Sequence, residues 1–82
     1  MSTPHEVQSP LPGTFYRSAS PDMPPFKSDG DDVAEGEVIG LVEVMKQFSE
    51  VTADASGRIQ RFLVGNGEPI DSGQALLLID LP

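Results

Sequence analysis

The chain has 82 residues, and its 13 acidic and 5 basic side chains give a formal net charge of −8 at pH 7. A chain of this length forms one small domain, and so acidic a domain repels the phosphates of nucleic acids and anionic membranes. We therefore expect neither as a partner. The sequence contains no cysteine and one histidine, which excludes disulfides and thiolate metal sites, and we expect no metal.

The first nine residues are polar and show no periodicity, so we predict a flexible tail over residues 1–9 and one domain over residues 10–82. The N-terminus lacks the basic and apolar stretches of a secretion signal. The longest apolar run, at residues 75–79, is far too short to span a bilayer. We therefore expect a soluble, cytoplasmic protein.

Short apolar runs alternate with turn residues along the rest of the chain, and no stretch carries the spacing of an amphipathic helix. Three prolines within residues 18–25 predict a loop. The fold class is all-β, with strands predicted at residues 14–16, 38–44, 48–53, 58–64 and 75–80. The apolar residues expected in its core are Phe15, Leu41, Val42, Phe62, Leu77 and Ile79.

The chain contains a degenerate internal repeat. Residues 30–43 align with residues 67–80, and both segments read Gly, acid, x, apolar, x, x, Gly, followed by an apolar strand that ends in an acid. Residues 13–17 align with residues 57–61 at an offset of 44 rather than 37, so the first half holds seven extra residues within 18–29. Neither half could bury its apolar face alone, so the repeat predicts a sandwich with pseudo-two-fold symmetry.

Lys46 lies between the two copies, where the flanking strands predict a hairpin with Met45 and Lys46 as its two-residue loop. Such loops need positive φ and favour Asn and Gly, so Met and Lys are poor residues there. Residues that break local rules gather at functional sites. A primary amine held out on a turn suits acylation, because the product is a stable amide. The alternative is an ordinary solvated lysine.

The acids add to this interpretation. Between residues 28 and 57 Lys46 is the only base, against eight acids. We expect an acidic face around Lys46 that steers docking to basic surfaces, with a rate that falls as salt rises. If the rate is independent of salt, the acids serve solubility alone.

The tripeptide Val44-Met45-Lys46 resembles the Ala/Val-Met-Lys-Met signature of biotinyl domains, with Gln47 in place of the second Met. Further matches to this family lie at residues 53–57 and 67–70, and the segments 13–18 and 20–22 resemble the biotin carboxyl carrier subunits of bacterial acetyl-CoA carboxylase. The resemblance covers residues 9–81. It implies a flattened β-barrel or sandwich of two four-stranded antiparallel sheets, a biotinyl/lipoyl domain.

By this resemblance Lys46 carries covalent biotin on its ε-amine. The neighbouring residues Glu43, Val44, Met45 and Gln47 would belong to the same site. The seven extra residues would form the family's protruding "thumb", with Ser20, Pro21 and Asp22 near the biotin.

The resemblance also implies a function without catalytic residues of the chain's own. The chain would be the non-catalytic carrier of a biotin-dependent carboxylase, for acetyl-CoA or a related acyl-CoA in fatty acid biosynthesis. A biotin protein ligase would attach biotin, which would then carry CO₂ from a biotin carboxylase subunit to a carboxyltransferase subunit.

Two alternatives stay open. Lipoyl-type carriers share the fold and the turn lysine, and an unmodified biotinyl-like domain would share them too. Lipoyl domains usually have Asp before the lysine, so Met45 favours biotin. An unrelated acidic β module that binds a protein partner would leave the unusual turn residues unexplained.

Overall fold

The computed structural model describes residues 4–82, which form eight strands and the loops that join them. Residues 1–3 of the predicted tail lie outside it. No helix long and apolar enough to cross a membrane occurs in residues 4–82. The strands in chain order are β1 (His5–Gln8), β2 (Gly13–Tyr16), β3 (Asp32–Val33), β4 (Val38–Val44), β5 (Gln47–Thr52), β6 (Gly57–Phe62), β7 (Glu68–Ile70) and β8 (Ala75–Asp80).

All five predicted strands are confirmed, with ends that shift by at most two residues. The short strands β3 and β7 were not predicted. Each has two or three residues. So short a run carries no alternation that a sequence pattern could show. Both lie inside the aligned segments of the repeat, and they are equivalent to each other.

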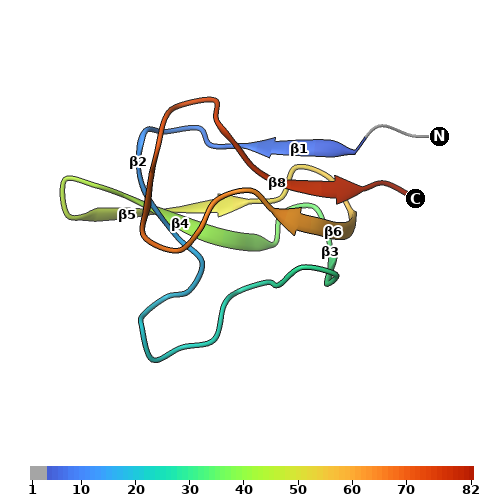
Figure 1. The fold of residues 1–82 in the computed structure, drawn as a ribbon, viewed down its shortest axis with the longest axis horizontal. Helices are drawn as coiled ribbons and strands as arrows, with labels where there is room; N and C mark the ends of the chain where they lie inside the picture. The colour runs from blue at the N-terminus through green and yellow to red at the C-terminus, as the bar shows by residue number, and fades with distance from the viewer. Residues whose placement is uncertain (1–3) are drawn as a thin grey trace.

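The strands form two four-stranded sheets, ordered β1-β8-β6-β3 and β5-β4-β2-β7, and every pairing is antiparallel. The two orders are equivalent: β1, β8, β6 and β3 of the first sheet take the places of β5, β4, β2 and β7 of the second. This topology confirms the predicted pseudo-two-fold sandwich. Figure 1 shows the β4–β5 hairpin at one end of the molecule and both chain ends at the other.

Equivalent backbone hydrogen bonds continue the edge pairing of each sheet, β3 with β6 in one and β7 with β2 in the other. The amide of Gly30 donates to the carbonyl of Ile59, and the amide of Gly67 donates to the carbonyl of Phe15, both at 2.7 Å. Both pairs lie at the repeat offsets of the sequence. The repeat therefore extends from side chains to main-chain geometry.

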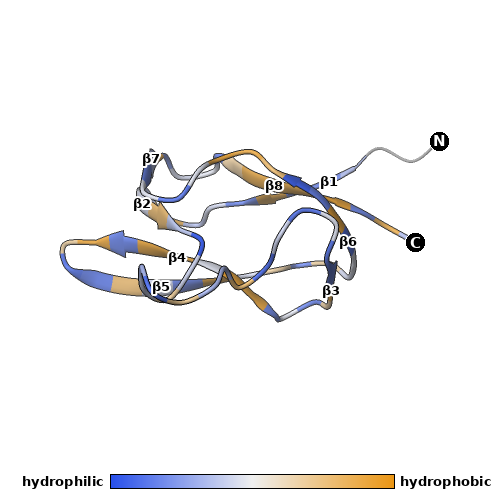
Figure 2. Cartoon of the chain, turned by 60° about the horizontal axis from the view of Figure 1, so that its bottom comes forward, coloured by the Kyte–Doolittle hydropathy of each residue, from blue (hydrophilic) through white to orange (hydrophobic). Residues whose placement is uncertain are grey.

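The core lies between the sheets and is built from alternate residues of the strands. Figure 2 shows β8 orange, hence hydrophobic, through most of its length. The prediction for Leu41 is wrong, because it is half-buried on the outer face beside the buried Val42, and Phe62 packs against the core while partly buried. The other four predicted core residues are buried: Phe15, Val42, Leu77 and Ile79.

The flexible tail predicted for residues 1–9 is wrong from His5 onward. Strand β1 pairs with β8, with Val7 opposite Leu77, and the Val7 side chain is 2% exposed. The His5 ring lies 2.7 Å from a carboxylate oxygen of Asp54. A single buried apolar residue and one edge pairing hold this strand, so its sequence looks like that of a tail.

The contacts of Glu37, just before β4, make the stability of the fold depend on pH. The backbone amide of Ala34 and the Lys27 ammonium both donate to Glu37, at 2.7 and 3.0 Å. These hydrogen bonds lower the pKa of Glu37 from its ordinary 4.5. The carboxyl group of Glu37 binds its proton more tightly in the unfolded chain than in the folded one. The stability that these hydrogen bonds contribute is therefore complete above pH 4.5 and is lost as pH falls through the lower pKa of the folded state.

We therefore expect Glu37→Gln to destabilise the domain at neutral pH and to matter less in acid. Urea unfolding of both proteins at about pH 7 and about pH 3 checks this. A difference in unfolding free energy that stays constant between the two pH values would contradict the assignment.

Candidate functional site

The β4–β5 hairpin closes through a two-residue turn, as the sequence predicts. Val44 pairs with Gln47, which leaves Met45 and Lys46 at the tip with φ of 51° and 68°. Positive φ at both central residues defines a type I′ turn. Each residue with a side chain in this conformation costs about 1–2 kcal/mol. The pairing of β4 with β5 on both sides of the turn stabilises the hairpin and offsets this cost.

The turn presents its side chains to solvent. Met45 is 91% exposed and Lys46 is exposed as well. Within residues 4–82 the Lys46 ammonium has no hydrogen-bond or ion-pair partner. The amine is therefore free to reach the active site of another protein.

The neighbours of the turn are fixed by the sheet. Val44 packs against the core, and Gln47 is exposed at the start of β5. Glu43 accepts a hydrogen bond from the Tyr16 hydroxyl at 3.2 Å, across the β4–β2 pairing. This hydrogen bond, then burial and the negative charge of Glu43, raise the pKa of Tyr16. Tyr16 and Glu43 are thus a hydrogen-bonded pair on the outer face of the sheet.

The seven extra residues of the first half lie in a loop that protrudes between β2 and β3 (Figure 1). The amide of Phe26 donates to the carbonyl of Arg17 at 2.8 Å, and this bond closes the base of the loop. The Arg17 guanidinium lies 4.1 Å from the centroid of the Phe62 ring and donates to the carbonyl of Lys27 at 3.4 Å. Arg17 therefore ties the loop to the sheet.

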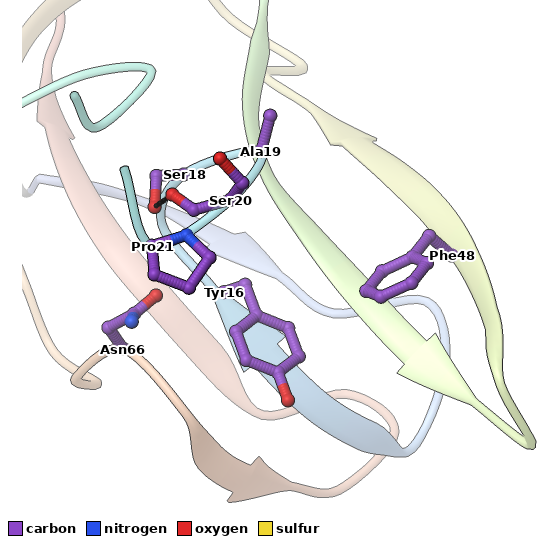
Figure 3. Close-up of a pocket in the computed structure, with 7 residues that line it drawn as sticks. All are labelled: Tyr16, Ser18, Ala19, Ser20, Pro21, Phe48 and Asn66. Atoms are coloured by element: carbon purple, nitrogen blue, oxygen red, sulfur yellow. Dashed lines mark hydrogen bonds between the residues drawn. The ribbon is translucent and has the colours of Figure 1, made fainter. Parts of the chain in front are cut away.

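A pocket of about 270 Å³ lies between this loop and the outer face of the β5-β4-β2-β7 sheet. Figure 3 shows Pro21 on one side of the Tyr16 ring and the ring of Phe48 on the other side. The two rings are 6.0 Å apart and inclined at 55°. Ser20 and Pro21 thus line this pocket, and Asp22 does not. The lining residues are Tyr16, Ser18, Ala19, Ser20, Pro21, Phe48 and Asn66.

The acidic face predicted around Lys46 is wrong for most of the acids. Of the eight acids, only Glu43 and Glu50 lie on the hairpin strands. Strand β4 is seven residues long, so its start lies about 20 Å from the turn. Within residues 4–82 no group of acids and histidine could hold a metal. Of the other six acids, Glu35 and Glu37 precede β4 and Asp54 follows β5, while Asp29, Asp31 and Asp32 lie before or within β3.

Residues 5–79 match the family model described as biotin-requiring enzyme. The chain belongs to this biotinyl/lipoyl family. The biotin carboxyl carrier protein of acetyl-CoA carboxylase from Chlamydia trachomatis is 47% identical to it over 73 residues, which cover 89% of this chain and 44% of the relative. The protein of the same name from Nostoc is 42% identical over 74 residues, covering 90% and 41%. The chain thus spans less than half the length of these relatives.

Solved structures confirm the sandwich of a biotinyl/lipoyl domain. Kluyveromyces lactis urea carboxylase matches with a TM-score of 0.77 and 24% identity, over 98% of this chain and 6% of that one. A single-chain, multi-domain long-chain acyl-CoA carboxylase matches with a TM-score of 0.79 and 23% identity, over 100% and 8%. At these identities the likeness shows the fold alone.

The strained turn makes a prediction for this biotinyl/lipoyl domain. Met45→Asn places a residue that tolerates positive φ at the first turn position, so we expect the domain to gain about 1 kcal/mol in unfolding free energy. Urea unfolding measures the gain. Thr52→Asn, at an exposed position at the far end of the same strand pair, serves as the control and should not stabilise. Equal or lower stability of Met45→Asn would show that the turn is not strained.

Proposed function

We propose that this chain is the biotin-carrying domain of a biotin-dependent carboxylase, with biotin joined to Lys46 through an amide. The observation that carries the proposal is the exposed Lys46 amine at the tip of a type I′ turn. The names of the curated relatives favour a carboxylase acting on acetyl-CoA. In that role the chain would serve the first steps of fatty acid biosynthesis.

The residues present fit a covalently attached biotin. The Lys46 amine attacks an activated biotinyl group, the amide C–N bond forms, and the activating group leaves with its electron pair while the amine gives up a proton. Biotin, once attached, supplies the ring nitrogen that carries CO₂ between active sites. The turn that carries Lys46 closes the β4–β5 hairpin, which lies at the end of the domain opposite to the chain ends (Figure 1).

The pocket under the protruding loop suits the other end of the cofactor. Its walls are two aromatic rings, the small side chains of the loop and the amide of Asn66, which suit a compact ring system with one polar edge. We assign Ser20 and Pro21 to contact with biotin, and Asp22 to the rim. Glu43, Val44, Met45 and Gln47 would then form the surface that the ligase reads.

The partners follow from this role. A biotin protein ligase would modify Lys46, and biotin carboxylase and carboxyltransferase components would use the product in turn. The chain contributes no catalytic group to either reaction. Its contribution is the tether, because covalent attachment turns each encounter into an intramolecular search at high effective concentration.

A transfer assay tests the proposal. The biotinylated chain is mixed with the biotin carboxylase subunit of a bacterial acetyl-CoA carboxylase, ATP and radiolabelled bicarbonate. We expect protein-bound label that is lost when acetyl-CoA and carboxyltransferase are added. The unbiotinylated chain is the control and should stay unlabelled. A biotinylated chain that never takes up label would contradict the carrier role.

A further inference from the structure

The two outer faces of the sandwich are related by the pseudo-two-fold axis, so one serves as a reference for the other. Cross-strand partners share a face, as do residues two apart on a strand. The outer face of β5-β4-β2-β7 has two rows, Glu50–Leu41–Tyr16 and Phe48–Glu43–Thr14. We call these six residues the aromatic face.

The outer face of the other sheet also has two rows, Glu6–Leu78–Arg61 and Asp80–Arg58–Asp32. We call these six residues the mixed-charge face. Arg58 lies 3.5 Å from Asp32 and is in register with Asp80, so bases and acids alternate here. Such a surface is suited to solvent, because its charges compensate one another.

The symmetry shows what the two faces share. Leu41 matches Leu78 and Glu43 matches Asp80 at the offset of 37, while Glu50 matches Glu6 at the offset of 44. A side-chain hydrogen bond recurs as well, since Gln60 donates to Asp80 at 3.4 Å where Tyr16 donates to Glu43. These shared features belong to the framework of the fold.

What differs is specific to the aromatic face. Arg58 corresponds to Thr14 at the offset of 44, and Arg61 lies opposite Leu78 where Tyr16 lies opposite Leu41, so the aromatic face has a ring in place of a base. Phe48 adds a second ring that is 59% exposed, which is costly for a residue that serves only stability. One exposed ring, Phe48, and one half-buried ring, Tyr16, therefore lie beside two carboxylates that have no base on this face.

We propose that the aromatic face docks the enzyme that carboxylates the biotin, through a cationic side chain of that enzyme, in particular an arginine. A guanidinium stacks on aromatic rings and pairs with carboxylates. Tyr16 and Phe48 supply the rings, and Glu43 and Glu50 supply the charge. Both rings line the pocket under the loop and neither carboxylate does, so the arginine reaches the rings from the side of Glu43 and Glu50, outside the pocket.

Acylation of Lys46 strengthens this docking. The hairpin from Val38 to Thr52 holds two acids, Glu43 and Glu50, and one base, Lys46. Amide formation removes the base, so the modified hairpin attracts a cation more strongly than the unmodified one. The docking face thereby favours the biotinylated form. This inference rests on the proposed carrier function.

The symmetry also supplies the control for the test. Glu50 and Glu6 are equivalent, exposed and each in register with a leucine. The biotinylated chain is titrated as substrate of a bacterial biotin carboxylase subunit. We expect Glu50→Gln to raise KM about threefold at low salt with kcat unchanged, and the effect to fade as salt rises. Glu6→Gln should leave KM unchanged. Phe48→Leu, which keeps apolar bulk, should raise KM about twofold at every salt concentration.

The outcomes separate the two proposals. Equal KM changes in Glu50→Gln and Glu6→Gln, or no change in either, overturn the docking face while the carrier function stands. A wild-type chain that carries biotin but is not carboxylated at any concentration overturns both. A salt-dependent KM change confined to Glu50→Gln supports the docking face.

Discussion

Lys46→Arg should abolish biotinylation completely. The variant keeps the positive charge and most of the length of the side chain at an exposed turn, so the fold should not change. It removes the primary amine, and a guanidinium stays protonated and does not form the amide. Intact mass after co-expression with a biotin protein ligase and excess biotin measures the result. The wild-type chain should gain one biotinyl group and the variant none.

Lys27→Arg is the matched control. Lys27 and Lys46 are the only lysines of the chain, and Lys27 is held in an ion pair with Glu37 at 3.0 Å. This variant should be biotinylated like the wild-type chain. If the Lys46→Arg variant still gained a biotinyl group, the site would lie on Lys27 or the amino terminus instead.

Gly57→Ala should be among the most destabilising single substitutions in the chain, costing about 2–3 kcal/mol. An added methyl group would meet the carbonyl oxygen of Asp80 and lie 2.7 Å from a methyl carbon of Ile79. Neither neighbour can move away, because both belong to β8 in the centre of its sheet. The result is overpacking of backbone against backbone. Urea unfolding at neutral pH measures the loss.

The equivalent glycine of the other half should behave alike. A methyl group on Gly13 would meet the carbonyl oxygen of Glu43 and lie 2.8 Å from a methyl carbon of Val42. Gly65→Ala is the control, because its nearest neighbour would be a carboxylate oxygen of Glu68 at 3.4 Å. A Gly57→Ala loss no larger than that of Gly65→Ala would contradict the close approach of the strands.

The sequence predicts the long strands well because each of them carries several apolar residues. Strand β1 escapes detection, since Val7 is its only buried apolar residue. The repeat holds the missing signal. At the offset of 44, Glu6-Val7 lies over Glu50-Val51, and both valines are buried. Extending the alignment upstream would therefore have predicted a strand in place of a tail.

The candidate site is predictable only where it is local in sequence. The turn at Lys46 follows from two neighbouring residues that are unsuited to positive φ. The pocket does not, because it joins the protruding loop to Phe48 and Asn66, which are far apart in the sequence. No periodicity reports such a contact.

Distance along the chain was equally misleading for the acids. Glu37 and Asp54 lie within nine residues of Lys46 in the sequence. They flank the far ends of β4 and β5, because an extended strand gains about 3.3 Å with every residue. The same extension places Glu43 and Glu50 on the outer face near the turn. Charge counted along the sequence therefore overstates the field at the lysine.

The most direct test of the central claim offers Lys46 both of the cofactors that the family carries. The purified chain is incubated in parallel with biotin protein ligase plus biotin and with lipoate ligase plus lipoate, each with ATP, and its intact mass is recorded. The account predicts one biotinyl group per chain from the first reaction and no addition from the second. A lipoyl addition without a biotinyl one, or no addition from either enzyme, would contradict it.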